Sequence, residues 1–204
     1  EGFGAVALGR WGTATVGRHV IGCATYRLAC MSDLFPIWIV NPRICSQHVL
    51  ICVVGASGSY RVIDHVVQSF SHLKESTFTL FHIVPPLPLQ DNQLVQILNK
   101  HPFEEQSSFF TRNMEEYSGK VKDIMEYGTN KLLDAGVPEE NIVQKIQYLR
   151  EGIARDMITE LEEGDHGILV IGRKGSKAID LFGLGSKAYK LLCTAPTFIT
   201  CLVD

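Results

Sequence analysis

Short hydrophobic runs alternate with stretches in which apolar residues recur every three or four positions. The runs predict buried strands, and they cover residues 49–54, 78–84, 142–149, 168–171 and 198–203. The stretches predict amphipathic helices, and they cover residues 59–73, 107–134, 153–161 and 184–194. Strands in regular alternation with helices are typical of a parallel sheet with helices on both faces. The pattern therefore predicts an α/β fold of the doubly wound, Rossmann-like kind.

The longest helical stretch, residues 107–134, carries a clear apolar stripe. Its members follow one another at steps of three and four, with one gap, and are Phe110, Met114, Tyr117, Val121, Ile124 and Leu132. We expect all of them, Met114 included, to pack against the core. Gly136 follows the stripe and is predicted to end the helix.

The N-terminal segment repeats the C-terminal one. Shifting it by 163 positions (172 − 9 = 163) places residues 4–40 over 167–203 without a gap. Identical pairs include Gly9/Gly172, Arg10/Arg173, Gly12/Gly175, Gly22/Gly185, Tyr26/Tyr189 and Cys30/Cys193. We therefore divide the chain into the closing strand, loop, helix and strand of a first copy (1–41), a linker (42–47) and a complete second copy (48–204).

A segment of about 40 residues cannot bury a core of its own. Either residues 1–41 lack the rest of their domain, or they dock onto the second copy. The chain begins at Glu1, directly in front of a predicted strand, so we expect it to be part of a longer protein.

Composition narrows the classes of function. The chain has 204 residues, a net charge of −3 and 46% hydrophobic residues, which fits a globular protein and excludes a disordered one. Its basic residues are scattered, so no nucleic-acid partner is expected. No apolar run approaches the roughly 20 residues that cross a bilayer, and no signal peptide is visible, so we expect a cytoplasmic protein without membrane insertion. The six cysteines form no C-x-x-C pair and are expected to be free thiols rather than disulfides or zinc ligands.

A glycine-rich loop is the strongest candidate for chemistry. Gly172-Arg173-Lys174-Gly175 follows a predicted strand, and after nine residues Gly185-Ser186 opens a helix. Glycines allow tight turns and expose backbone amides, and a helix N-terminus favours phosphate. Two other features carry less weight. The run at residues 55–59 lacks the lysine of a phosphate loop, and His82 is expected to be a buried core residue with its hydrogen bonds made.

This spacing, between the fourth strand and the fourth helix, resembles the ATP-binding branch of the universal stress protein family. The resemblance covers residues 48–204, and residues 1–41 resemble the tail of a preceding domain in tandem members. It implies an adenine nucleotide α-hydrolase-like sheet of five parallel strands in the order 3-2-1-4-5. It also implies a nucleotide site. Its residues would be Val54 and Ser57 lining the nucleotide, Ile83 meeting adenine through its backbone, and Gly172, Lys174, Gly175, Gly185 and Ser186 around the ribose and phosphates.

The sequence departs from the family at two places. Members that bind ATP usually carry an aspartate after the first strand, where this chain has Gly55. Loss of one hydrogen bond to adenine costs about 1–3 kcal/mol. In the first copy, Trp11 and Cys23 stand in place of the lysine and the serine, so no nucleotide is expected there.

The resemblance implies a regulator that binds ATP, AMP or ADP, with or without magnesium. No nucleophile–base pair and no metal site stand out, so we expect at most a slow ATPase and favour a non-catalytic role. The family also implies self-association through the last strands, here residues 198–203 against Ile37–Val40 within the chain or against another chain, and an unidentified protein partner.

Three alternatives remain at this stage. The first, favoured by Gly55, is an interaction module that has kept the fold and lost the nucleotide. The second is an enzyme of the nucleotide α-hydrolase type, which would need a richer serine, glycine and aspartate loop after the first strand. The third is a regulatory domain of a larger protein such as a transporter.

Overall fold

The computed structural model describes residues 4–10, 21–31, 35–41, 46–85, 103–173, 184–194 and 198–203. The described strands are β1 (Val6–Gly9), β2 (Ile37–Val40), β3 (His48–Cys52), β4 (Phe78–Val84), β5 (Ile142–Tyr148), β6 (His166–Gly172) and β7 (Ile199–Val203). The described helices are α1 (Cys23–Met31), α2 (Gly58–Phe70), α4 (Phe103–Asp134), α5 (Ile153–Glu163) and α6 (Ser186–Thr194), with a 3-10 turn at Glu139–Asn141. None of these helices is long and apolar enough to cross a membrane.

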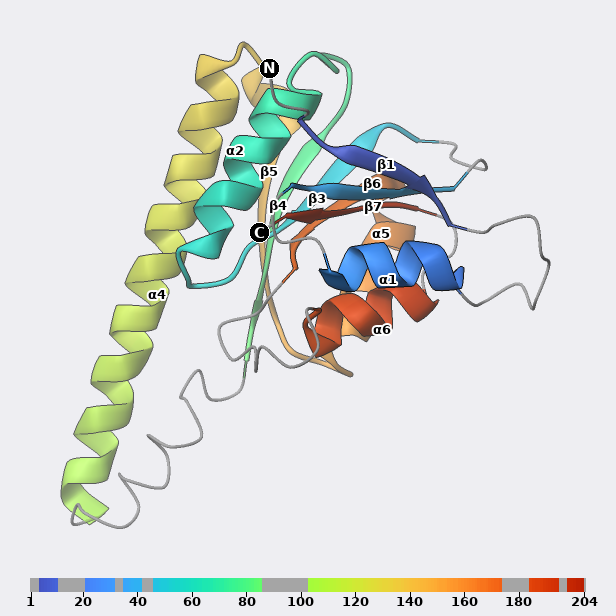
Figure 1. Ribbon diagram of the computed structural model, residues 1–204. Coiled ribbons are helices and arrows are strands. Elements are labelled where there is room, and N and C mark those ends of the chain that lie inside the picture. The colour runs from blue at the N-terminus through green and yellow to red at the C-terminus, as the bar shows by residue number, and fades with distance from the viewer. Residues whose placement is uncertain are drawn as a thin grey trace.

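The strands form one sheet in the order β1-β2-β7-β6-β3-β4-β5 (Figure 1). Within the second copy, the five strands are parallel. Numbered by their place in that copy, they lie in the order 3-2-1-4-5, as predicted. The α/β fold is thus confirmed. The predicted elements are also found, with ends that differ by a few residues: α4, for example, begins at Phe103 rather than at position 107.

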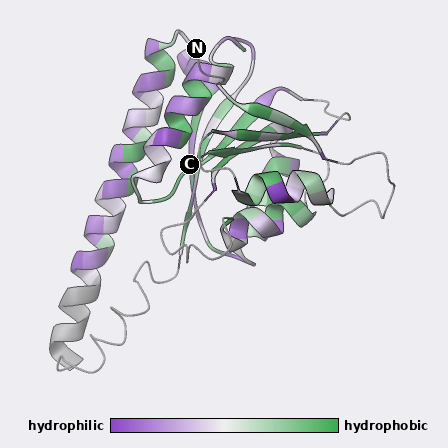
Figure 2. Cartoon of the chain, viewed as in Figure 1, coloured by the Kyte–Doolittle hydropathy of each residue, from purple (hydrophilic) through white to green (hydrophobic). Residues whose placement is uncertain are grey.

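The core lies on both faces of the sheet. Helices α1, α5 and α6 cover one face, and α2 and α4 cover the other (Figure 1). Because successive side chains of a strand point to opposite faces, Leu50 and Cys52 of β3 belong to the first cluster, and Val49 and Ile51 to the second. Figure 2 shows the same division, with hydrophobic strands inside and a largely hydrophilic outer surface on α4.

Helix α4 follows its predicted stripe only where the sheet lies beneath it. Val121, Ile124 and Leu132 are buried, but Met114 is 37% exposed, so its predicted place in the core is wrong. The reason is visible in Figure 1, where the N-terminal half of α4 projects beyond the sheet. Gly136 ends the helix as predicted, with a φ of 78°.

The segment of residues 1–41 docks onto the second copy through strand pairing. Strand β2 pairs antiparallel with β7, with Ile37 opposite Leu202 and Trp38 opposite Cys201, while β1 lies parallel to β2 on its far side. The predicted pairing of the last strands is therefore found within the chain.

Two buried arginines make reciprocal contacts across this junction. The Arg10 guanidinium donates to the carbonyl of Leu192, and the Arg173 guanidinium donates to the carbonyl of Ala29 over 2.9 Å. The two arginines are equivalent in the sequence repeat, and so are the two residues that accept from them (173 − 10 = 163 and 192 − 29 = 163). The two repeated segments are thus related locally by an approximate two-fold axis.

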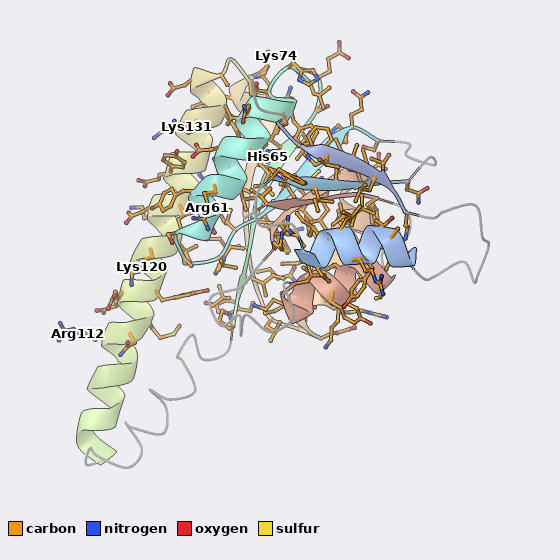
Figure 3. The ribbon with its side chains drawn as sticks, in the orientation of Figure 1. Arg61, His65, Lys74, Arg112, Lys120 and Lys131 are labelled. Atoms are coloured by element: carbon orange, nitrogen blue, oxygen red, sulfur yellow. The ribbon has the colours of Figure 1, made fainter. Side chains whose placement is uncertain are left out.

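Trp38 adds a second link between β2 and the rest of the molecule. Its indole N–H donates to Nε2 of His65 over 2.9 Å, and its ring stacks on Phe70 at 5.1 Å. His65 lies on the side of α2 that faces the sheet, whereas Arg112 and Lys120 point outward from α4 (Figure 3).

Candidate functional site

Three of the predicted site residues lie at the carboxyl edge of the sheet. Val54 lies just after β3, Ile83 near the end of β4 and Gly172 at the end of β6. Strand β3 lies between β4 and β6, so the order of strands reverses at β3. In doubly wound sheets, ligands bind beyond the carboxyl ends of the strands at such a reversal.

The glycine loop is closed by its own backbone. The Arg173 amide donates to the carbonyl of Val203 over 2.7 Å, and the Gly185 amide donates to the carbonyl of Arg173 over 2.9 Å. These two amides hold the ends of the loop together and are not directed at a ligand. Lys174 and Gly175 lie outside the described residues, as does the side chain of Ser186.

The first turn of α6 supplies the described donors for an anion. Its first intrahelical bond runs from the Tyr189 amide to the carbonyl of Gly185, so the amides of residues 186–188 lie at the positive end of the helix dipole. Lys187 belongs to this turn, and its charge contributes to lowering the pKa of His82 on β4. Amide donors at a helix N-terminus with a nearby lysine fit a phosphate group.

The loop after β3 is held by a serine. The Val54 amide donates to the Ser59 hydroxyl over 2.8 Å, and that hydroxyl donates back to the Val54 carbonyl over 2.7 Å. The backbone of Val54 is therefore occupied, and its side chain is 37% exposed. Ser57 is also exposed, and its side chain makes no capping bond to α2. Val54 and Ser57 would therefore contribute to a site through side chains that line it.

The backbone of Ile83 is directed toward this loop. The Val53 amide donates to the carbonyl of Phe81, and the Leu149 amide donates to the carbonyl of Val84. In a parallel ladder, alternate residues bond to opposite neighbours, so residues 81 and 83 both face the β3 side. Because β3 ends at Cys52, the peptide groups of Ile83 lie beside the loop that follows it. This placement fits the predicted contact with a base.

His82 links the ends of β3 and β4. It is 1% exposed, with Nδ1 at 2.9 Å from the carbonyl of Val53 and Nε2 at 3.2 Å from the hydroxyl of Tyr117. A carbonyl only accepts, so Nδ1 carries the hydrogen and Nε2 accepts from the tyrosine. Burial lowers the pKa of His82, and the Val53 carbonyl opposes that shift in part. The predicted core role of His82 is confirmed.

Tyr117 of α4 lies over Gly55. Burial raises the pKa of the Tyr117 phenol, and the nearby Gly55 amide offsets that rise in part. A Cβ atom at Gly55 would lie only 2.8 Å from Cε2 of Tyr117. Any larger residue at position 55 would therefore clash with the ring of Tyr117 unless the ring moved. The sequence placed Tyr117 in a core stripe, and only the tertiary structure brings it to the site.

The described residues hold no group of three or more histidine, cysteine, aspartate or glutamate side chains that could bind a metal ion. Cys52 and Cys201 are buried free thiols. Burial raises the pKa of both far above the ordinary value, so they stay protonated and unreactive at neutral pH.

No family model and no curated protein matches the chain. Solved structures do match. The universal stress protein UspA from Lactobacillus plantarum is 14% identical with a TM-score of 0.57, over 78% of this chain and 97% of that one. A universal stress protein from Archaeoglobus fulgidus is 15% identical with a TM-score of 0.54, over 99% of this chain and 62% of that one.

A third match is a universal stress protein solved in complex with cAMP. It is 16% identical with a TM-score of 0.50, over 78% of this chain and 97% of that one. At this level of identity, the three likenesses establish the fold of the chain, which is that of the universal stress proteins.

Proposed function

We propose that this chain, which has the universal stress protein fold, is a regulator that binds an adenine nucleotide at the carboxyl edge of its sheet. The observation that carries the proposal is the meeting of two features at the strand reversal. The first turn of α6, with Lys187, offers donors and charge for phosphate, and the backbone of Ile83 faces the loop after β3. The solved fold relative in complex with cAMP lends further support.

In the proposed complex, the phosphates contact the amides of residues 186–188 and the loop from Gly172 to Gly185, including Lys174 and Gly175. The ribose lies beside Ser186, and the base reaches toward Ile83, Val54 and Ser57. ATP is the proposed ligand, with ADP and AMP as weaker ones because they carry fewer phosphate charges. A magnesium ion would arrive bound to the phosphates rather than to a carboxylate cluster of the chain.

The proposed role is non-catalytic. His82 is the histidine nearest the site among those described, and both of its ring nitrogens are engaged. It therefore offers no free base for activating water. Nucleotide occupancy would instead act through association, by contacting the loop before α6 and so changing the surface beside β7 and β2. Within this proposal, residues 1–41 are the closing segment of a first copy that binds no nucleotide.

The second candidate function is an interaction module of the same fold without a nucleotide. Tyr117 favours the interaction module, because its ring lies against Gly55 and its hydroxyl lies near a backbone amide that a base would use. The exposed side chain of Lys187, in the first turn of α6, favours nucleotide binding instead.

Calorimetric titration of the purified chain with ATP distinguishes the two functions. We expect binding in the wild type and at least a tenfold weaker affinity in Lys187→Glu, because the substitution places a negative charge beside the phosphates. Lys190→Glu, in the same helix but one turn further from its N-terminus, is the matched control and should change the affinity less than threefold. A wild-type chain that shows no binding at millimolar ATP would support the interaction module.

A further inference from the structure

One phenol engages the two polar groups that the end of β3 and the end of β4 direct at the base half of the proposed site. The Tyr117 hydroxyl lies near the Gly55 amide and donates to Nε2 of His82 at 3.2 Å. Nδ1 of that histidine is fixed in turn by the carbonyl of Val53. Each of these contacts is made within the protein.

The ring of Tyr117 also takes up space next to the loop. It contacts Gly55 so closely that a single added carbon would lie 2.8 Å from the ring. A nucleotide base is a flat ring system of similar thickness, so it cannot lie over Gly55 while the phenol is there. From this we propose that Tyr117 is the specificity-determining residue of the site: it excludes the base until the ring moves aside.

This inference rests on the proposed function and makes it more specific. With the ring in place, the site binds the phosphates of a nucleotide and is indifferent to its base. The ring is able to move because Tyr117 is only half-buried and lies one turn of α4 from the exposed Met114.

When the ring moves, it releases one donor and one acceptor. The donor is the Gly55 amide, and the acceptor is Nε2 of His82, which carries no hydrogen because Nδ1 does. Both had been within hydrogen-bond reach of one oxygen, so they are close together. Adenine offers the complementary pair, an acceptor at N7 and a donor at N6, whereas guanine offers two acceptors on the same edge. For a base that presents this edge, the opened site therefore selects adenine over guanine.

The test compares ATP, GTP and inorganic tripolyphosphate by calorimetric titration of the wild type and of Tyr117→Ala. In the wild type, we expect the three affinities to agree within about threefold. In Tyr117→Ala, ATP should bind about tenfold tighter, since its adenine base gains stacking area and hydrogen bonds to the two released polar groups. GTP and tripolyphosphate should remain within threefold of their wild-type affinities. Thermal melting of each variant checks that it is folded.

Tyr117→Phe and Tyr127→Phe form a matched pair on α4. The first removes the hydroxyl from His82, and the second removes a hydroxyl that donates to Asp64 away from the site. We expect a two- to fivefold gain in ATP affinity for Tyr117→Phe and none for Tyr127→Phe. The ¹⁵N resonance of His82 Nε2 gives an independent readout: in Tyr117→Ala it should shift on saturation with ATP and stay in place with tripolyphosphate, and in the wild type it should stay in place with both.

The outcomes separate this inference from the function on which it rests. If Tyr117→Ala weakens ATP binding, or if ATP and GTP gain equally, Tyr117 does not exclude the base, and nucleotide binding still stands. If His82 Nε2 in Tyr117→Ala shifts equally with ATP and tripolyphosphate, the inference is overturned as well. If no ligand binds to any variant, the proposed function fails, and the inference fails with it.

Discussion

At the scale of single residues, buried polar side chains fix how the two repeated segments fit together. Arg10 and Arg173 are 1% and 0% exposed, and each donates to a backbone carbonyl of the other segment. Arg173 reaches two of them, Ala29 and Phe35. A buried guanidinium is stable only with such partners. These arginines therefore hold α1 and α6 in one arrangement.

Replacing Arg173 with methionine should lower the free energy of unfolding by about 2–4 kcal/mol, because two buried carbonyls lose their donors. Urea unfolding measures the change. Arg155→Met is the matched control, since Arg155 is 73% exposed and forms an exposed ion pair with Glu151; it should cost no more than about 0.5 kcal/mol. Equal losses in the two variants would contradict the role assigned to Arg173.

Buried histidines should make the stability depend on pH. Burial lowers the pKa of His65, His82 and His166 in the folded chain. The unfolded chain then binds more protons below its ordinary histidine pKa of about 6.5. The stabilising effect is fully present above that pH and is lost as the pH falls toward the lowered folded pKa values.

Urea unfolding at pH 7.5, 6.5 and 5.5 should therefore show a falling free energy of unfolding. His65→Gln keeps an acceptor for the indole of Trp38 but does not titrate. The variant should lose less stability than the wild type over the same pH range. An identical pH dependence in both proteins would exclude His65 as a contributor.

At the scale of elements, α4 is the part whose two halves differ most. Its C-terminal half packs on the sheet through Val121, Ile124 and Leu132, and its N-terminal half projects beyond it (Figure 1). The helix stops at Gly136, whose amide donates to the carbonyl of Leu133 over 2.8 Å in a left-handed conformation. This stop directs the chain into β5.

Gly136→Ala should destabilise the protein by about 1–2 kcal/mol, because a Cβ atom is disfavoured at a φ of 78°. Gly119→Ala on the same helix has no atom within 4 Å of the added carbon and should stabilise it by up to about 1 kcal/mol. Thermal melting of the two variants should give shifts of opposite sign. Shifts of the same sign would contradict this reading of the helix end.

At the scale of the whole molecule, the antiparallel junction of β2 and β7 makes one continuous sheet from two repeated parts. Trp38 lies opposite Cys201, and these positions are equivalent in the repeat (201 − 38 = 163). A second copy of β7 would place Cys201 opposite Cys201 in the same arrangement. Strand β2 thus occupies the edge through which two complete copies would pair.

A chain that lacks residues 1–47 should therefore dimerise through β7, because removal of β2 leaves that edge without a partner. Light scattering coupled to size-exclusion chromatography would measure its mass beside that of the full chain. We expect a dimer for the shortened chain and a monomer for the full chain at equal concentrations. A monomeric shortened chain would show that the edge of β7 does not drive association.

The sequence by itself determined the elements and their order. Hydrophobic periodicity is a local property, so it predicted the β4 boundaries and the end of α4, and the alternation of elements led to the parallel sheet. The resemblance to a family whose members pair through their last strands also anticipated the pairing of β2 with β7.

Only the tertiary structure decided which polar groups meet. Tyr117 and Gly55 are separated by many residues and belong to elements with separate patterns, so no local signal joins them. Met114 fits its stripe but lacks a sheet beneath it, and the Gly185 amide serves the loop rather than an anion. Periodicity tells which face of an element is apolar, while contacts between elements depend on where each one ends in space.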